Sequence, residues 1–203
     1  DVDLFQNYRV LHERDRGLRQ LVITALDSGD THRIAFDEPA YSLSGEANPE
    51  WETSIFRYVY DSMTTPDTVY DYNMATRERT MLKRRPVLGD FDPAHYVTER
   101  RTARAPDDTE VPVSLVYRKG TRLDGSAPLW LEGYGAYGYP NDVYFSSNRL
   151  SLLNRGVIYA VAHIRGGGDL GKAWHDAGRM LNKMQTFTDF IAVAETLIRE
   201  RYT

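Results

Sequence analysis

A unit of short strands and tight turns occurs twice within the first 85 residues and restricts the possible folds most. Each copy contains runs rich in β-branched and aromatic residues, separated by polar turns, as strands require. Both copies end in a proline, Pro39 and Pro86, which are 47 residues apart. Units of roughly 40–50 residues built from short strands are typical of β-propeller blades. A simple β meander is the alternative, because two blades cannot close a ring. Strands are predicted at residues 9–13, 18–26, 31–36, 56–60, 68–74 and 79–83.

A change of pattern near residue 90 separates this repeat from a second region. Residues 86–93 contain two prolines and a glycine and are the predicted linker. Propeller blades are therefore expected in residues 1–85 and an α/β domain in residues 94–203. From residue 128 onward strands alternate with helices, which predicts a parallel sheet with right-handed crossovers for that part. Its predicted elements are a hairpin (96–105 and 111–119), a strand (128–131), a helix (146–155), an apolar strand (157–162) and a final helix.

The final helix has two features that can be compared with a structure. An apolar stripe at helical spacing is expected to face the core. Thr186 and Asp189 have the spacing of a capping box, which predicts that the helix starts near Thr186. The stripe comprises Phe187, Phe190, Ile191, Ala194, Leu197 and Ile198.

Composition excludes several classes of function. The net charge is −4, so no overall positive field would attract nucleic acid. Cysteine is absent, which excludes disulfides and thiolate metal sites and fits a reducing compartment, so a cytoplasmic protein is expected. The longest strongly apolar run has six residues, far too few to span a membrane. None of the five histidines forms a pair at helical metal-binding spacing, and neither a metal nor another cofactor is predicted.

Residues 133–138 match G-x-G-x-x-G and follow a predicted strand, which by itself suggests dinucleotide binding. In that motif the third glycine lies in the first turn of the helix that holds the pyrophosphate. Here residues 139–142 intervene, and the predicted helix begins about eight residues after Gly138. A tight loop that requires positive φ is the structural alternative.

The set of residues needed for nucleophilic catalysis is incomplete in this sequence. Cysteine is absent, and no serine lies in G-x-S-x-G, the elbow that an α/β hydrolase carries between a strand and a helix. The chain is therefore expected to stop before such an elbow and to be inactive alone. Unpaired sheet edges are also expected to make it associate with copies of itself.

Several segments, taken together, resemble the prolyl oligopeptidase family of serine peptidases. They are residues 131–138 (LEGYGAYG), 162–171 (AHIRGGGDLG) and 186–191 (TFTDFI). Four others resemble its oligopeptidase B branch, namely residues 36–42, 70–80, 86–96 and 111–119. The resemblance implies the terminal blades of a β-propeller followed by the N-terminal half of an α/β-hydrolase domain, truncated before the nucleophile elbow. It also implies endopeptidase action on short basic peptides after Arg or Lys, without a cofactor.

The same resemblance implies roles for individual residues. Tyr134 matches the tyrosine whose hydroxyl contributes to the oxyanion hole. Asp142 matches an acidic position that binds a second basic residue of the substrate, and Tyr137 matches an aromatic position near the site. Asp169 is a candidate for a contact across the domain interface, whereas Glu132 has no assigned role. The family's catalytic Ser, Asp and His have no counterpart among the 203 residues.

Two functions of other classes remain open from the sequence. One is a nucleotide-binding α/β domain that uses the loop from Gly133 to Gly138. The other is a non-catalytic interaction module built on the propeller blades.

Overall fold

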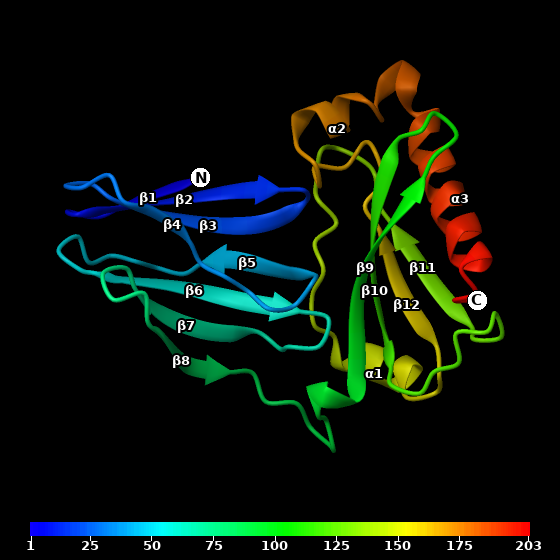
Figure 1. The fold of residues 1–203 in the computed structure, drawn as a ribbon, viewed down its shortest axis with the longest axis horizontal. Helices are drawn as coiled ribbons and strands as arrows, with labels where there is room; N and C mark the ends of the chain where they lie inside the picture. Colours follow the sequence, from blue (N-terminus) through cyan, green and yellow to red (C-terminus); the bar gives the residue numbers. More distant parts are fainter.

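Three four-stranded sheets form the framework of the structure, a computed structural model that describes all 203 residues (Figure 1). The first two sheets are antiparallel, and their strands lie side by side in chain order, as in propeller blades. The first sheet contains β1 (Val2–Leu4), β2 (Tyr8–Asp15), β3 (Leu18–Ala25) and β4 (Thr31–Arg33). The second contains β5 (Tyr41–Gly45), β6 (Ile55–Ser62), β7 (Thr68–Asn73) and β8 (Arg79–Arg84).

The two blades share one hydrophobic core. Along β6 every second residue is buried, which is the alternation expected of a strand with one face in a core. Phe56 and Tyr58 from this strand pack with Phe5, Val10 and Ile23 of the first blade. The rings of Phe5 and Phe56 meet edge to face, with centroids 6.3 Å apart. The six predicted strands of this region are confirmed, whereas the short β1 and β5 were missed.

The third sheet is mixed rather than parallel. Its order is β11-β12-β10-β9, and only β11 and β12 run parallel. The predicted parallel pairing of β11 and β12 and the predicted antiparallel hairpin β9–β10 are both confirmed, and the hairpin extends the sheet because β10 also pairs with β12. Its elements are η1 (Pro93–His95), β9 (Tyr96–Arg104), β10 (Glu110–Arg118), β11 (Leu129–Gly133) and β12 (Ile158–Ala162).

Helices cover both faces of this sheet. Val113 and Ala160 point to one face, where they share a core with Val193 of the long helix. Tyr159 and Val161 point to the other face and pack with Leu153 of the first helix. Because β12 is buried on both faces, its sequence is continuously apolar, as predicted. The helical elements are α1 (Ser147–Leu153), α2 (Lys172–Asp176), η2 (Met180–Asn182) and α3 (Met184–Arg199).

Both detailed predictions for the final helix need correction. The helix α3 begins at Met184, and Thr186 and Asp189 form no capping box, since both side chains are buried and bonded to Arg165. The buried face is also rotated from the predicted stripe, and its residues are Thr186, Asp189, Ala192, Val193, Thr196 and Leu197. Phe187, Ile191 and Ile198 are instead more than half exposed. They form an apolar row on the outer side of α3.

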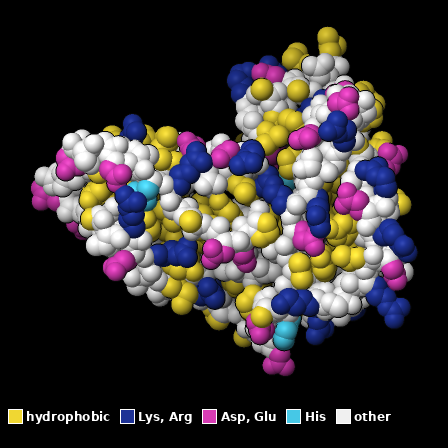
Figure 2. Space-filling model, viewed as in Figure 1, with side chains coloured by type: hydrophobic (Ala, Val, Ile, Leu, Met, Phe, Trp, Pro, Cys, Tyr) yellow, Lys and Arg dark blue, Asp and Glu magenta, His cyan; other side chains and the backbone are white.

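Charges of both signs are interspersed over the face shown in Figure 2, without one continuous basic surface. In this view β8, whose residues are all exposed, lies at the lower left of Figure 1. None of the helices has the length and apolarity needed to cross a bilayer.

Candidate functional site

Tyr134 follows β11 directly, at the carboxyl end of the parallel pair β11–β12. Its side chain is half exposed. The next residue, Gly135, has a φ of +60°, and a Cβ atom there would lie 2.4 Å from Cγ2 of Thr186. Only glycine fits, because a side chain would strain the backbone and overlap Thr186. This glycine allows the chain to turn sharply and leaves the Tyr134 ring at the surface.

The loop that carries Tyr134 is fixed against a second glycine loop. A Cβ atom on Gly166 would lie 2.3 Å from the carbonyl oxygen of Gly135, so the two backbones touch. The amide of Gly138 donates a hydrogen bond to the carbonyl of Gly166 at 3.1 Å. Lys183 immediately precedes α3, and its Nζ donates a hydrogen bond to the carbonyl of Gly135 at 2.6 Å. Backbone contacts and a cation together determine the course of this loop.

The three residues singled out from the sequence lie in the same connection between β11 and α1. Tyr137 is 82% exposed and has a φ of +56°, so its ring projects into solvent. Asp142, by contrast, is partly buried against the first blade. The connection thus presents two exposed tyrosines, Tyr134 and Tyr137, and one carboxylate at the blade surface.

The glycine loop does not have the geometry of a pyrophosphate site. The next helix, α1, begins at Ser147, nine residues after Gly138. Pyrophosphate binding requires the third glycine to open that helix, so that its free amides reach the phosphates. The loop instead packs against His175, whose Nδ1 bonds the carbonyl of Gly166 at 2.8 Å. No group of three or more His, Asp or Glu side chains is placed to hold a metal ion.

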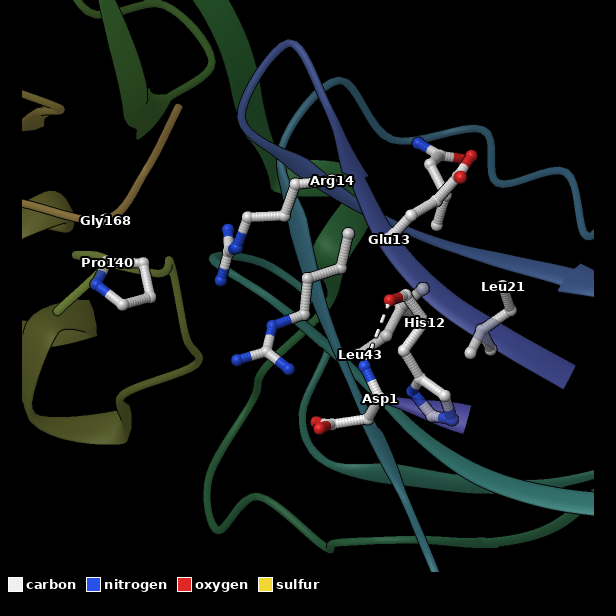
Figure 3. A pocket seen from close by; sticks show the side chains of 10 residues that line it. Asp1, His12, Glu13, Arg14, Leu21, Leu43, Pro140 and Gly168 are labelled. Carbon is white, nitrogen blue, oxygen red and sulfur yellow. Dashed lines mark hydrogen bonds between the residues drawn. The ribbon is translucent and has the colours of Figure 1, made fainter. Parts of the chain in front are cut away.

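Asp142 is paired with two arginines of the first blade. Its Oδ2 atom lies 2.7 Å from Nη2 of Arg14 and 3.1 Å from Nε of Arg19. Burial opposes ionisation, but these two guanidinium groups outweigh it and lower the pKa of Asp142. Figure 3 shows the Arg14 side chain pointing from β2 towards the loops of Pro140 and Gly168. The carboxylate therefore joins the two halves of the chain.

A buried Ser–His–Asp array lies behind the glycine loops, and no sequence motif indicated it. Oγ of Ser114 lies 2.8 Å from Nε2 of His163, and Nδ1 of His163 lies 2.8 Å from Oδ1 of Asp169. The connectivity is that of a catalytic triad. However, Ser114 is 1% exposed in the middle of β10, and Asp169 is 2% exposed. No substrate carbonyl can reach the serine, so the array has a structural role.

The Asp169 side chain also holds the loop that contains Asn141. Its Oδ1 atom also accepts the backbone amide of Asn141 at 2.9 Å, one residue before Asp142. The side-chain partners of Asp169, His163 and Asn141, lie on the α/β side, whereas its backbone carbonyl lies 3.5 Å from the position of a Cβ atom on Gly17 of the first blade. The segments that carry these partners are separate in sequence, so they must pack together before the carboxylate can form its hydrogen bonds.

Glu132, which had no assigned role, belongs to a polar cluster beside α1. Its carboxylate accepts a hydrogen bond from the hydroxyl of Tyr159 on the neighbouring strand. The guanidinium of Arg149 lies 3.9 Å from the centre of the Tyr159 ring. Tyr159 thus contacts the carboxylate through its hydroxyl and the guanidinium through a cation–π interaction of its ring.

A second interface contact involves a carboxyl group with a high pKa. Oδ1 of Asp61, on β6, accepts the backbone amide of Phe145 at 2.8 Å. Burial raises the pKa of Asp61 to about 7, although the Phe145 amide favours the charged form. This contact joins the second blade to the connection that carries Tyr134.

Stability is expected to fall as this group ionises. The folded protein binds the Asp61 proton more tightly than the unfolded chain does. The contribution of this proton to the free energy of unfolding is therefore complete below about pH 4 and is lost as the pH rises through about 7. The expected slope is at most about 1.4 kcal/mol per pH unit. Urea unfolding between pH 4 and 8 should show this slope in the wild type and a flatter one in Asp61→Asn. Asp90→Asn, at an exposed loop position, is the control, and equal slopes in all three proteins would contradict the assignment.

Two family models match separate parts of the chain. The model for the prolyl oligopeptidase N-terminal beta-propeller domain matches residues 1–85, and the prolyl oligopeptidase family model matches residues 143–203. The propeller match coincides with the two blades, and the second covers α1 to α3.

Curated relatives align with almost all of this chain. The dipeptidyl aminopeptidase BI of Pseudoxanthomonas mexicana is 48% identical over 201 residues, which are 98% of this chain and 28% of the relative. Protease 2 of Moraxella lacunata is 36% identical, over 98% of this chain and 29% of its own length. The chain thus spans less than a third of the length of these relatives.

Solved structures agree with this relationship. Oligopeptidase B from Leishmania major superimposes with a TM-score of 0.91 at 38% identity, over 100% of this chain and 30% of that one. Oligopeptidase B from Trypanosoma brucei gives 0.90 at 39% identity, over 98% and 29%. The match includes both blades and the third sheet, so the predicted fold class, propeller blades followed by part of an α/β-hydrolase domain, is confirmed. With propeller and peptidase segments in the same order and fold, the chain belongs to the prolyl oligopeptidase family.

Proposed function

We propose that these residues form the junction between propeller and peptidase domain in a serine endopeptidase that cleaves short peptides after Arg or Lys. The observation that carries the proposal is the half-exposed Tyr134 on a rigid glycine loop at the carboxyl end of parallel strands. Ligands of open α/β sheets bind at this end. The phenol O–H of Tyr134 donates to the oxyanion that develops as the scissile carbonyl is attacked.

The catalytic Ser, Asp and His are proposed to lie in parts of the protein outside these residues. The low coverage of the relatives, 28–30% of their length, supports this idea. We accordingly propose that the 203 residues alone are inactive. Residues 1–85 are assigned to the propeller, 86–93 to a linker and 94–203 to the peptidase domain of a cytoplasmic enzyme.

Asp142 and Tyr137 are proposed to bind substrate. Both arginine contacts of Asp142 use Oδ2, which leaves Oδ1 to accept a basic side chain of the peptide. Arg14 and Arg19 already neutralise the carboxylate, so this subsite is expected to be weaker than a free carboxylate would be. The exposed ring of Tyr137 offers an aromatic surface beside the same peptide.

Hydrolysis of fluorogenic peptide amides by the full-length protein tests the proposal. The substrates carry Arg or Ala at the scissile position, and a second pair compares Arg-Arg with Ala-Arg. We expect fast cleavage after Arg, little after Ala, and loss of the Arg-Arg preference in Asp142→Asn. Cleavage of neither substrate would refute the peptidase assignment, and equal cleavage of both would refute the specificity.

The 203 residues alone are proposed to associate. The outer row of α3, Phe187, Ile191 and Ile198, is apolar and exposed, and β11 is an edge strand of its sheet. Sedimentation velocity should show mass that rises with concentration. Replacing the three residues by lysine should shift the protein towards monomer, while the same change at the exposed polar residues Asn182, Glu195 and Glu200 should not. A monomer at all concentrations would contradict the proposal.

A further inference from the structure

Lys183 occupies an unusual place for a cation. It immediately precedes α3 (Met184–Arg199) and is partly buried. A positive charge at the amino end of a helix is unfavourable, because the helix dipole is positive there. Its contacts include no carboxylate: Nζ lies 2.6 Å from the carbonyl oxygen of Gly135 and 3.2 Å from Oγ1 of Thr186, with the Phe187 ring centre at 5.9 Å. The position therefore needs an explanation other than helix stability.

The carbonyl of Gly135 depends on this ammonium group. Thr186 Oγ1 is the other nearby donor, but it has one hydrogen and three carbonyl oxygens within reach. The carbonyl of Arg165 lies nearest, at 2.8 Å, that of Gly178 at 3.2 Å, and that of Gly135 farthest, at 3.4 Å. The single hydrogen of the Thr186 hydroxyl is therefore best donated to the carbonyl of Arg165. Lys183, with three donors, is then the strong partner of the Gly135 carbonyl.

This carbonyl belongs to the residue that follows Tyr134. Gly135 has a positive φ of 60° and no side chain to restrict it, so its own conformation is intrinsically free. Holding its carbonyl fixes the direction in which the chain leaves Tyr134. A phenol donor must lie within a few tenths of an ångström of its place to stabilise an oxyanion, and a shift of about 1 Å can lower a rate about 10²-fold.

We propose that Lys183 is a positioning residue, which holds the Tyr134 loop in the conformation that stabilises the oxyanion. The inference rests on the proposed peptidase function. Lys183 itself does not touch the substrate. It acts through the Gly135 carbonyl, and its charge at the helix start is retained for that contact rather than for the stability of α3.

A double-mutant cycle in the full-length protein tests this role. Lys183→Met, Lys183→Arg and the control Lys172→Met are each made with Tyr134 and with Tyr134→Phe, and kcat and KM are measured on an Arg peptide amide. Lys172 is exposed on α2 and paired only with Asp176. Hydrogen exchange at the amides of Gly138 and Tyr139, both hydrogen-bonded within the loops, reports loop order without any reference to activity.

Lys183→Met is expected to lower kcat about 10- to 100-fold with little change in KM. Lys183→Arg should restore most of the rate, and Lys172→Met should match the wild type. In the Tyr134→Phe background Lys183→Met should cost less than about threefold, because both changes remove one function. Exchange at Gly138 and Tyr139 should quicken in Lys183→Met alone.

Other outcomes would overturn the inference. Multiplicative effects of Lys183→Met and Tyr134→Phe would mean that Lys183 acts independently of Tyr134. An unchanged kcat, or a fall that Lys183→Arg does not reverse, would equally refute the positioning role. If the wild type cleaves no peptide amide, the proposed function fails and the catalytic purpose of Lys183 fails with it. Unchanged exchange in an active Lys183→Met enzyme would refute the loop contact and with it the positioning role.

Discussion

Tyr134→Phe in the full-length protein is expected to lower kcat for an Arg peptide amide by about 10²–10³-fold and to leave KM nearly unchanged. The phenol O–H has no charged partner in the ground state, but a negative oxygen forms opposite it during attack. An interaction made only in the transition state lowers the barrier without tightening substrate binding. Phenylalanine keeps the ring and removes only the donor. The half-exposed position makes a change in folding small.

A tyrosine of the same connection provides the control for this prediction. Tyr139 lies five residues farther along and is also exposed, so Tyr139→Phe removes a hydroxyl from the same surface. Steady-state kinetics should show wild-type values for Tyr139→Phe. Equal losses in both variants would mean that the loop tolerates neither change, and an unchanged kcat in Tyr134→Phe would remove this residue from the oxyanion hole.

Asp189→Ala is expected to cost about 3–5 kcal/mol of unfolding free energy, the largest loss of stability among these variants. The carboxylate of Asp189 is fully buried and contacts the guanidinium and the backbone amide of Arg165, at 2.6–3.1 Å. Alanine would leave the Arg165 charge buried beside a cavity. Because Arg165 precedes the glycines at 166–168, the site loops should also loosen. Urea unfolding followed by circular dichroism measures the difference.

Asp107 offers a matched comparison on the same arginine. It contacts the Arg165 guanidinium at 2.6 Å, but its side chain is 41% exposed. The Arg165 hydrogen bond lowers the pKa of Asp107 to about 2. Water can replace an exposed partner, so Asp107→Ala should cost only about 1 kcal/mol or less. Equal losses in the two variants would show that burial does not decide the strength of these pairs.

The propeller blades could be predicted in detail because their information is local. A strand such as β6 alternates buried residues with less buried ones, and polar turns separate the strands, so hydrophobic period and turn residues were sufficient for most of them. The strands β1 and β5 were not predicted because their sequences are short and weakly apolar. The prediction of the buried face of α3 was wrong because the helix has more than one apolar row. Helical spacing reveals both rows, and the sequence cannot tell which one faces the sheet.

The family resemblance, the order of strands and helices, and the place of Tyr134 on a glycine-bordered loop can all be read from the residues in order along the chain. The groups that surround that loop follow from how distant segments pack. Asp142 pairs with Arg14, 128 residues away, and the carbonyl of Gly135 binds Lys183, 48 residues away. Thr186 and Asp189 form no capping box because their side chains form hydrogen bonds to buried Arg165 instead. Local signals record backbone preference and burial period, whereas hydrogen bonds and ion pairs between distant segments form only where packing brings them together.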